Sequence, residues 1–199
     1  MLSRPLVLAS GSPRRRRILQ DAGLDFTIQV SDAEPEPQPG ADAAAFAVEA
    51  ARMKAGDVAG RCPGRIVIGA DTVIALDNAI LGKPEDSADA TQMLRSLSGR
   101  RHQVITGMAI VFNDGEDVRA VWTGFESSDV IFKELSDEDI GCYVETGEPM
   151  GKAGAYAIQG RGGDLVERVD GSYLNVVGLP IELLRKCLDD IGYTGPAEQ

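Results

Sequence analysis

Near the start of this chain lie residues that are able to bind an anion. The short apolar segment Leu6–Ala9 is typical of a buried strand, and it leads into Ser10-Gly11-Ser12. Ser12 is a favourable N-cap and Pro13 a favourable first helical residue, so a helix is predicted from Pro13 onward. The arginines at 14–17 then fall in the first helical turn, where the macrodipole disfavours each cation by roughly 0.3–1 kcal/mol. Backbone N–H groups, hydroxyls and guanidinium groups that converge in this way predict a site for a polyanion such as phosphate.

The four arginines are not equivalent. Helical spacing places Arg14 and Arg15 on the buried side of the predicted helix, from which they can lean into a cleft. Arg17 can pair with Asp21 one turn later, and Arg16 is expected to be solvated.

A second chemical signal is an acid within an apolar strand. Asp71 lies inside Ile66–Leu76, with Gly69 and Ala70 before it and Thr72 after it. An ionised aspartate in a buried strand is costly unless it is paired or binds a metal. A functional interpretation is therefore favoured over a structural one, and Asp71 could act as a general base, a metal ligand or both.

Two lysines could reach the same ligand. Lys54 lies at the end of an alanine-rich segment and Lys83 lies in a loop, and lysines so placed can contact phosphates as point charges. Each alone is more typical of a solvated surface lysine. The functional interpretation holds only if both share one cleft with Arg15 and Asp71.

The glycine-rich segment 152–163 has little periodicity and is predicted to be a loop that lines a site. Its small residues let the backbone approach a ligand, and Gln159 could offer a donor and an acceptor to a nucleobase edge. An ordinary glycine-rich turn is the alternative, since the segment is neither a dinucleotide-binding fingerprint nor a phosphate-binding P-loop. His102 is the only histidine, and a structural role is favoured for it.

The elements that must position these residues mix strands and helices without strict alternation. A mixed, twisted sheet flanked by helices, in the α/β class, is therefore predicted. Strands are predicted at Leu6–Ala9, Phe26–Val30, Ile66–Leu76 with an interruption at 69–72, Ala79–Leu81, Val104–Phe112, Val118–Phe125, Asp129–Lys133 and Leu165–Val169. Helices are predicted from Pro13, over Ala41–Ala59, Ser87–Leu97 and Ser136–Val144, and from Pro180 to about residue 191. An acidic, proline-rich loop is predicted at Asp32–Gly40 and a tight turn at Asp77-Asn78.

Composition limits the classes of partner. The 199 residues carry a formal net charge of −11, so long nucleic acids are not expected as partners, whereas a small anion carrying a metal ion suits the local arginine cluster. The three cysteines are far apart, which favours reduced thiols in a cytosolic protein. Neither a secretory leader nor a membrane span is indicated. One domain over 1–199 is expected, with a frayed tail at 192–199.

Several of these segments together resemble the Maf-like nucleoside triphosphate pyrophosphatases, in order and over nearly the whole chain. The matching segments are Leu8-Ala9-Ser10-Gly11-Ser12-Pro13-Arg14-Arg15, Gly69-Ala70-Asp71-Thr72, Gly82-Lys83-Pro84, Leu97-Ser98-Gly99-Arg100, Lys152-Ala153-Gly154-Ala155-Tyr156, Ile158-Gln159-Gly160 and Val177-Gly178-Leu179-Pro180.

The resemblance implies a Maf/ITPase-like fold with two lobes around a deep cleft, usually in a homodimer. It implies hydrolysis of a nucleoside triphosphate to the monophosphate and pyrophosphate with Mg2+ or Mn2+, in a house-cleaning role. Asp71 falls on the family's proton acceptor. The family's phosphate-handling positions correspond to Ser10, Arg15, Lys54 and Lys83. The positions that separate its subgroups correspond to Arg14, Thr72 and Gln159, and this combination is similar to the dTTP/UTP subgroup.

The chain departs from the family pattern in one segment. The family usually carries two adjacent acids near the metal, and here the segment is Ala33-Glu34-Pro35-Glu36. Either Glu34 or Glu36 could therefore join Asp71 as a metal ligand. Two other functions stay open: a 7-methyl-GTP pyrophosphatase, and a nucleotide-binding regulator of cell division without turnover.

Overall fold

The computed structural model describes residues 4–77 and 79–195, so Asn78 and residues 196–199 of the predicted turn and tail lie outside it. A seven-stranded sheet forms its centre, in the order β2-β1-β3-β5-β6-β7 with β4 paired to β3. The strands are β1 (Leu6–Leu8), β2 (Phe26–Ile28), β3 (Ile66–Leu76), β4 (Ala79–Leu81), β5 (Arg101–Asn113), β6 (Val118–Phe132) and β7 (Val166–Asp170). The α-helices are α1 (Pro13–Asp21), α2 (Ala43–Arg61), α3 (Ser87–Leu97), α4 (Asp137–Val144), α5 (Tyr173–Val177) and α6 (Ile181–Asp190). Two short 3-10 helices lie between α4 and β7, at Ala153–Ala155 and Arg161–Leu165.

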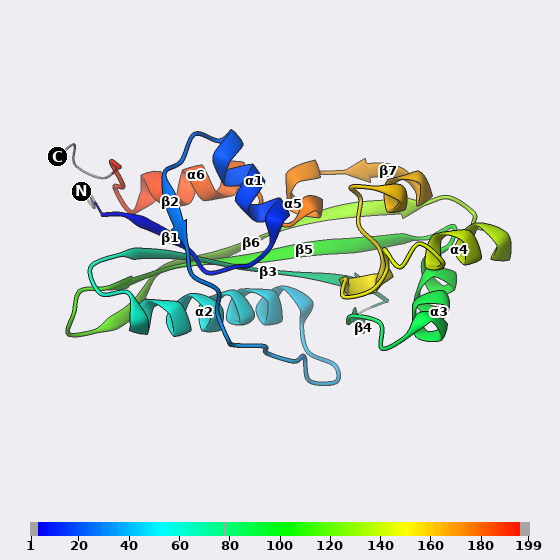
Figure 1. The fold of residues 1–199 in the computed structure, drawn as a ribbon, viewed down its shortest axis with the longest axis horizontal. Helices are drawn as coiled ribbons and strands as arrows, with labels where there is room; N and C mark the ends of the chain where they lie inside the picture. The colour runs from blue at the N-terminus through cyan, green and yellow to red at the C-terminus, as the bar shows by residue number, and fades with distance from the viewer. Residues whose placement is uncertain (1–3, 78, 196–199) are drawn as a thin grey trace.

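The sheet is mixed and covered by helices, as the sequence predicted. β1 is parallel to β2 and β3, while every other pair is antiparallel. Helix α2 lies against one face, and α1, α5 and α6 lie against the other, while α3 and α4 gather at one end (Figure 1). No helix within the described residues is long and apolar enough to cross a membrane.

One edge of β3 is open over a short stretch. β1 pairs with that edge as far as Ile68, and β4 joins the same edge only at Ile74, while β5 pairs with the opposite edge from Ile66 to Ala75. Within the described part of the chain no strand covers positions 69–73 of this edge. The opening lies beyond the carboxyl end of the parallel strand β1, which is where open α/β sheets bind ligands.

Side chains on the two faces of β3 explain why Asp71 and Thr72 border this opening. Alternate residues of a strand point to opposite faces. On one face, Thr72 separates two buried clusters, one around Ile68 and Leu8 and another around Ile74 and Leu94. On the other face, Asp71 interrupts the apolar contacts with α2. The apolar strand β3 thus carries two adjacent polar residues, Asp71 on one face and Thr72 on the other.

Two glycines let α2 lie unusually close to the sheet. A Cβ on Gly69 would be 2.2 Å from the Ala51 carbonyl oxygen, and a Cβ on Gly107 would be 2.1 Å from the Ala47 carbonyl carbon. Only glycine fits at such distances, and the alanine-rich side of α2 supplies the matching flat surface. This close packing brings Lys54, on α2, to the carboxylate of Asp71.

Two sequence predictions of local structure are wrong, and one helix was missed. β3 is continuous through 69–72, because Ala70, Asp71 and Thr72 stay paired with β5. β6 is one strand where two were predicted, because Glu126, Ser127 and Ser128 continue the ladder with β5. Helix α5 was not predicted, although Ser172 caps it by accepting a hydrogen bond from the Asn175 N–H at 3.2 Å.

Candidate active site

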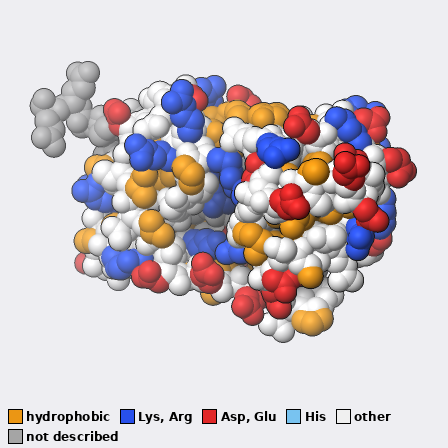
Figure 2. Space-filling model, turned by 45° about the vertical axis from the view of Figure 1, so that its right-hand side comes forward, with side chains coloured by type: hydrophobic (Ala, Val, Ile, Leu, Met, Phe, Trp, Pro, Cys, Tyr) orange, Lys and Arg blue, Asp and Glu red, His pale blue; other side chains and the backbone are white. Residues whose placement is uncertain are grey.

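A cleft of about 370 Å3 occupies the open edge of β3. One wall comes from the β1–α1 connection and the other from residues 151–159, so the glycine-rich segment lines a site as predicted. The polar and charged side chains that line the cleft are Ser10, Ser12, Arg14, Arg15, Glu34, Lys54, Asp71, Thr72, Lys83, Lys152, Tyr156 and Gln159. In Figure 2 the surface is hollowed near the middle, and lysine and arginine side chains gather around the hollow.

The cleft is strongly cationic although the chain is acidic. Five of its lining residues are lysine or arginine and two are carboxylates, which leaves an excess of three positive charges. The whole chain has a formal net charge of −11. Low-dielectric walls that carry one sign of charge concentrate ions of the opposite sign. The cleft therefore suits a ligand with several negative charges.

Arg15 joins the elements that meet at the cleft. Its Nε–H donates to the Gly178 carbonyl at 2.8 Å, and Nη1 donates to the Ala70 carbonyl at 2.9 Å and to Ser10 Oγ at 3.2 Å. Nη2 donates to Thr72 Oγ1 at 3.1 Å. Four of the five guanidinium N–H groups therefore have protein acceptors, which leaves one for a ligand. Burial lowers the pKa of Arg15, yet the group stays charged at neutral pH.

The contact with Ala70 shows that Arg15 has a structural role at the edge of β3. The Ile68 carbonyl lies on the same edge of β3, just before the open stretch, and accepts from the Ala9 N–H at 2.8 Å, where the chain leaves β1. The next carbonyl on that edge is Ala70, and Arg15 supplies the donor that a neighbouring strand would otherwise provide. The sequence predicted Arg15 only as a phosphate ligand and missed this role.

Ser10 presents a hydrogen-bond donor to the cleft. Its Oγ accepts from the Ser12 N–H and from Arg15 Nη1, each at 3.2 Å. A hydroxyl has two lone pairs and one proton, so the Ser10 proton remains available to a ligand. Phosphate oxygens, which are acceptors, match this arrangement.

Asp71 forms an ion pair with Lys54 inside the cleft. Lys54 Nζ lies 2.5 Å from Asp71 Oδ1, and the two side chains are only 23% and 16% exposed. Asp71 Oδ2 has no hydrogen-bond partner among the described residues, so it can accept a proton from a water molecule or bind a cation. The structure thus brings Lys54 and Asp71 together, as the functional interpretation of Lys54 required.

The acidic loop contributes one glutamate to the cleft. Glu34 lines it and lies 3.8 Å from Lys83, whereas Glu36 is not among the lining residues. Both partners of the Glu34–Lys83 pair are largely exposed, so this ion pair adds little stability. Of the two glutamates left open by the sequence, Glu34 is the one that lines the cleft with Asp71.

The opposite wall is held by Glu148. Its carboxylate accepts hydrogen bonds from Tyr143 Oη at 3.2 Å and from the backbone N–H groups of Arg161 and Gly162, each at 3.1 Å. Its backbone carbonyl accepts from Lys152 Nζ. One residue therefore fixes both the lysine and the loop that follows Gln159.

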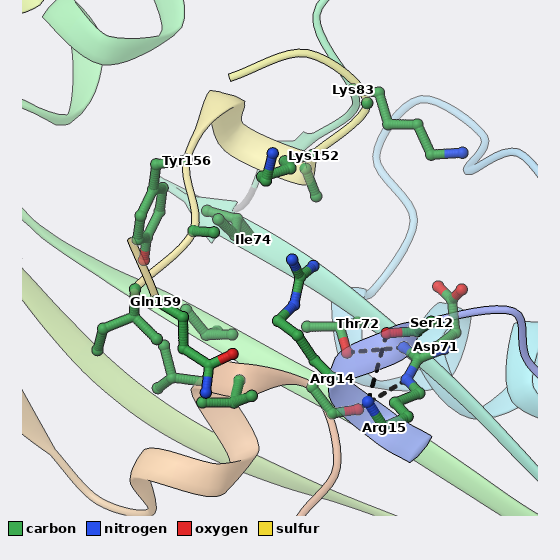
Figure 3. Close-up of a pocket in the computed structure, with 18 of the residues that line it drawn as sticks. Ser12, Arg14, Arg15, Asp71, Thr72, Ile74, Lys83, Lys152, Tyr156 and Gln159 are labelled. Carbon is green, nitrogen blue, oxygen red and sulfur yellow. Dashed lines mark hydrogen bonds between the residues drawn. The ribbon is translucent and has the colours of Figure 1, made fainter. Parts of the chain in front are cut away.

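Lys152 is a site residue that the sequence prediction missed. Burial, and then the charge of Arg14, lower its pKa. Figure 3 shows the Arg14 side chain rising through the cleft toward Lys152, with Gln159 and Thr72 on either side of Arg14. The available signal in the sequence was its position two residues before Gly154, because a glycine often marks a backbone turn. In the structure Gly154 has a φ of 63°, which glycine adopts readily.

The remaining predicted residues lie outside the cleft. Arg16 is exposed, and Arg17 forms the predicted ion pair with Asp21 at 3.0 Å. His102 is buried, its Nε2 lies 2.7 Å from Tyr156 Oη, and burial lowers its pKa to about 4. A neutral histidine packed edge-on against Phe132 is structural, as predicted.

Comparison with known proteins gives one family over almost the whole chain. Residues 5–191 match the family called Maf-like protein. A dTTP/UTP pyrophosphatase of Geobacter metallireducens is 53% identical over 178 residues, which is 88% of this chain and 90% of that protein. A dTTP/UTP pyrophosphatase of Thermococcus gammatolerans is 47% identical over 188 residues, which is 94% of this chain and 97% of that protein.

Solved structures give the fold. A HAM1 protein from Coxiella burnetii superposes with a TM-score of 0.52 at 16% identity, covering 94% of this chain and 99% of that one. The Ham1 protein of Staphylococcus aureus superposes with a TM-score of 0.50 at 15% identity, covering 94% and 100%. The mixed sheet with flanking helices is therefore shared with proteins that have little sequence in common with this chain.

Proposed function

The chain belongs to the Maf-like family, and from this premise we propose that it is a nucleoside triphosphate pyrophosphatase acting on dTTP and UTP. One observation carries the mechanism: a carboxylate, Asp71, lies in a cleft that has an excess of three positive charges. The names of its relatives supply the substrates, and the cleft supplies the means of binding and cleaving a triphosphate.

Substrate binding is assigned to the two walls. The free proton of Ser10, the remaining N–H of Arg15 and the ammonium groups of Lys54, Lys83 and Lys152 bind the triphosphate oxygens. Arg14, Thr72 and Gln159 contact the nucleoside and set the preference among bases. The cations then stabilise the charge that develops on the leaving pyrophosphate.

Asp71 acts as the general base. Its Oδ2 removes a proton from a water molecule, whose oxygen forms a bond to the α-phosphorus. The bond from the α-phosphorus to the oxygen that bridges to the β-phosphorus breaks, so pyrophosphate leaves with that oxygen. Lys54, at 2.5 Å from Oδ1, holds the carboxylate in place and balances its charge before the proton moves.

A divalent cation, Mg2+ or Mn2+, fits the donor set. The described residues contain no group of three His, Cys, Asp or Glu side chains that could hold a metal ion alone. Mg2+ is commonly bound by one or two carboxylates together with substrate phosphates, and Asp71 and Glu34 both line this cleft. These two residues would hold the ion, which would neutralise phosphate charge when bound.

The test is pyrophosphate release from a nucleotide panel with Mg2+, using the wild-type protein and Asp71→Asn. We expect wild-type turnover of dTTP and UTP, and a loss of about 100-fold or more in Asp71→Asn with nucleotide binding retained. Asp21→Asn is the matched control, since it alters an exposed ion pair outside the cleft. Wild-type turnover in Asp71→Asn would overturn the mechanism. A preference for 7-methyl-GTP would reassign the substrate, and no release from any nucleotide would favour a regulator without turnover.

Three further properties belong to the proposal: a house-cleaning role in the cytoplasm, a homodimer, and partners that include neither long nucleic acids nor membranes. The homodimer rests on the family resemblance, and light scattering of the purified protein tests it directly.

A further inference from the structure

Thr72 is part of a closed ring of hydrogen bonds beneath the cleft. Arg15 Nη2 donates to Thr72 Oγ1 at 3.1 Å, and Thr72 Oγ1 lies 3.0 Å from Thr106 Oγ1. Thr106 Oγ1 donates to the Asn175 carbonyl at 3.1 Å. That carbonyl also accepts from the Gly178 N–H at 2.9 Å, and the Gly178 carbonyl accepts from Arg15 Nε–H at 2.8 Å.

The ring fixes the direction of each hydroxyl. A carbonyl oxygen only accepts, so the single proton of Thr106 points to Asn175. Thr106 must then accept from Thr72, whose own proton is thereby used. One lone pair of Thr72 is taken by Arg15, and the other remains. Thr72 can therefore act toward a ligand only as a hydrogen-bond acceptor, whereas Ser10 can act only as a donor.

This polarity suits a base and not a phosphate. Phosphate oxygens are acceptors and would meet a lone pair of Thr72, while Ser10 meets them with a proton. Uracil and thymine carry an N3–H donor between two carbonyl groups, and cytosine has an unprotonated N3 at the same place. An acceptor at Thr72 that faces N3 of the base therefore favours the imide bases over cytosine.

We infer that Thr106, fully buried on β5 and out of reach of any ligand, is a positioning residue that makes Thr72 an acceptor and so selects bases with an N3–H. The inference rests on the proposed function, because it assigns the base that the same cleft accepts. Asn175 holds the acceptor of Thr106 in place. It is fully buried, and its Nδ2 donates to the Val104 carbonyl and to Ser128 Oγ, each at 2.9 Å. These bonds anchor the carbonyl that receives the Thr106 proton.

The test compares kcat/KM for UTP and CTP in the wild-type protein, Thr106→Val and Thr106→Ser. Valine matches threonine in shape but removes the acceptor, so the Thr72 proton can turn into the cleft. We expect the UTP-to-CTP ratio to fall about tenfold or more in Thr106→Val, a change the size of one hydrogen bond. Serine keeps the hydroxyl and should keep the wild-type ratio. Equal losses for both nucleotides in Thr106→Val would overturn the inference.

A second measurement does not depend on how the variants fold. With the wild-type protein, N3-methyl-UTP should lose about tenfold or more in kcat/KM relative to 5-methyl-UTP, which carries the same added methyl group elsewhere on the ring. Equal hydrolysis of the two analogues would refute an acceptor contact at N3. If the wild-type protein hydrolyses neither UTP nor dTTP, the proposed function fails, and that result is distinct from a failed discrimination between bases.

Discussion

Replacing Arg15 with lysine separates two roles that this residue could have. As a ligand for phosphate alone, Arg15→Lys would keep the charge, leave the free protein as stable as before and raise KM. As a link between elements, it would destabilise the protein even without nucleotide. The structure favours the second outcome, because four of the five guanidinium N–H groups already have protein acceptors.

The size of the effect follows from the acceptors left behind. A lysine ammonium is a single point with three donors, and it cannot reach the Gly178 and Ala70 carbonyls together with both hydroxyls. At least one of the four acceptors then loses its donor, at about 1–3 kcal/mol when buried. The cleft admits water, so the lower part of that range applies and the loss is about 1–2 kcal/mol. For a chain of this length the midpoint of thermal unfolding should fall by about 2–8 °C.

The assay is thermal and urea unfolding of the nucleotide-free protein, followed by circular dichroism. Arg16→Lys is the matched control, since Arg16 lies on the same helix and is exposed. Equal unfolding midpoints for Arg15→Lys and Arg16→Lys would refute the argument that Arg15 links the walls of the cleft.

Two further predictions concern the sheet and its buried histidine. Gly69→Ala should lower the free energy of unfolding by about 1–3 kcal/mol, because the added Cβ meets the Ala51 carbonyl oxygen. Gly56 lies in α2, and a Cβ added there has nothing within contact distance. Gly56→Ala should therefore raise the free energy of unfolding by up to about 1 kcal/mol in the same urea titration, and equal effects of the two substitutions would contradict the packing argument. Burial holds the pKa of His102 at about 4 in the folded protein against 6.5 when exposed, so between these pH values the unfolded chain binds the extra proton. Stability should therefore fall by about 3 kcal/mol as pH drops from 6.5 to 4, and His102→Phe should flatten that slope in urea titrations at a series of pH values; an unchanged slope would refute the assignment.

The sequence predicted the parts of the fold that depend on local pattern. The cap at Ser12 and the alanine-rich helix form as expected, and the apolar run around Asp71 forms a strand without the interruption predicted at 69–72. The sequence predicted two strands here because Glu126-Ser127-Ser128 is polar, but β5 pairs with all three residues and β6 continues through them. The continuity of β6 is therefore determined by its pairing with β5 and not by the residues of the segment itself.

The candidate site divides in the same way. Residue types and the family resemblance identified Asp71, Lys54 and Arg15, and the structure places them together. Sequence reasoning missed Thr106 and Glu148 because their importance comes only from what they contact. Thr106 is one of several hydroxyls along the strands until the fold sets it between Thr72 and Asn175.

The contacts of Arg15 also determine when the cleft is complete. Arg15 is synthesised early, yet its Gly178 partner follows 163 residues later. A chain still emerging from the ribosome can already contain Asp71, the three lysines of the cleft and Gln159 while one side of the Arg15 guanidinium lacks its acceptor. The hydrogen bonds of Arg15 are therefore completed near the end of translation, when the C-terminal part of the chain returns to α1. Premature termination before Gly178 would yield a product that has every proposed catalytic side chain but lacks this acceptor and helix α6.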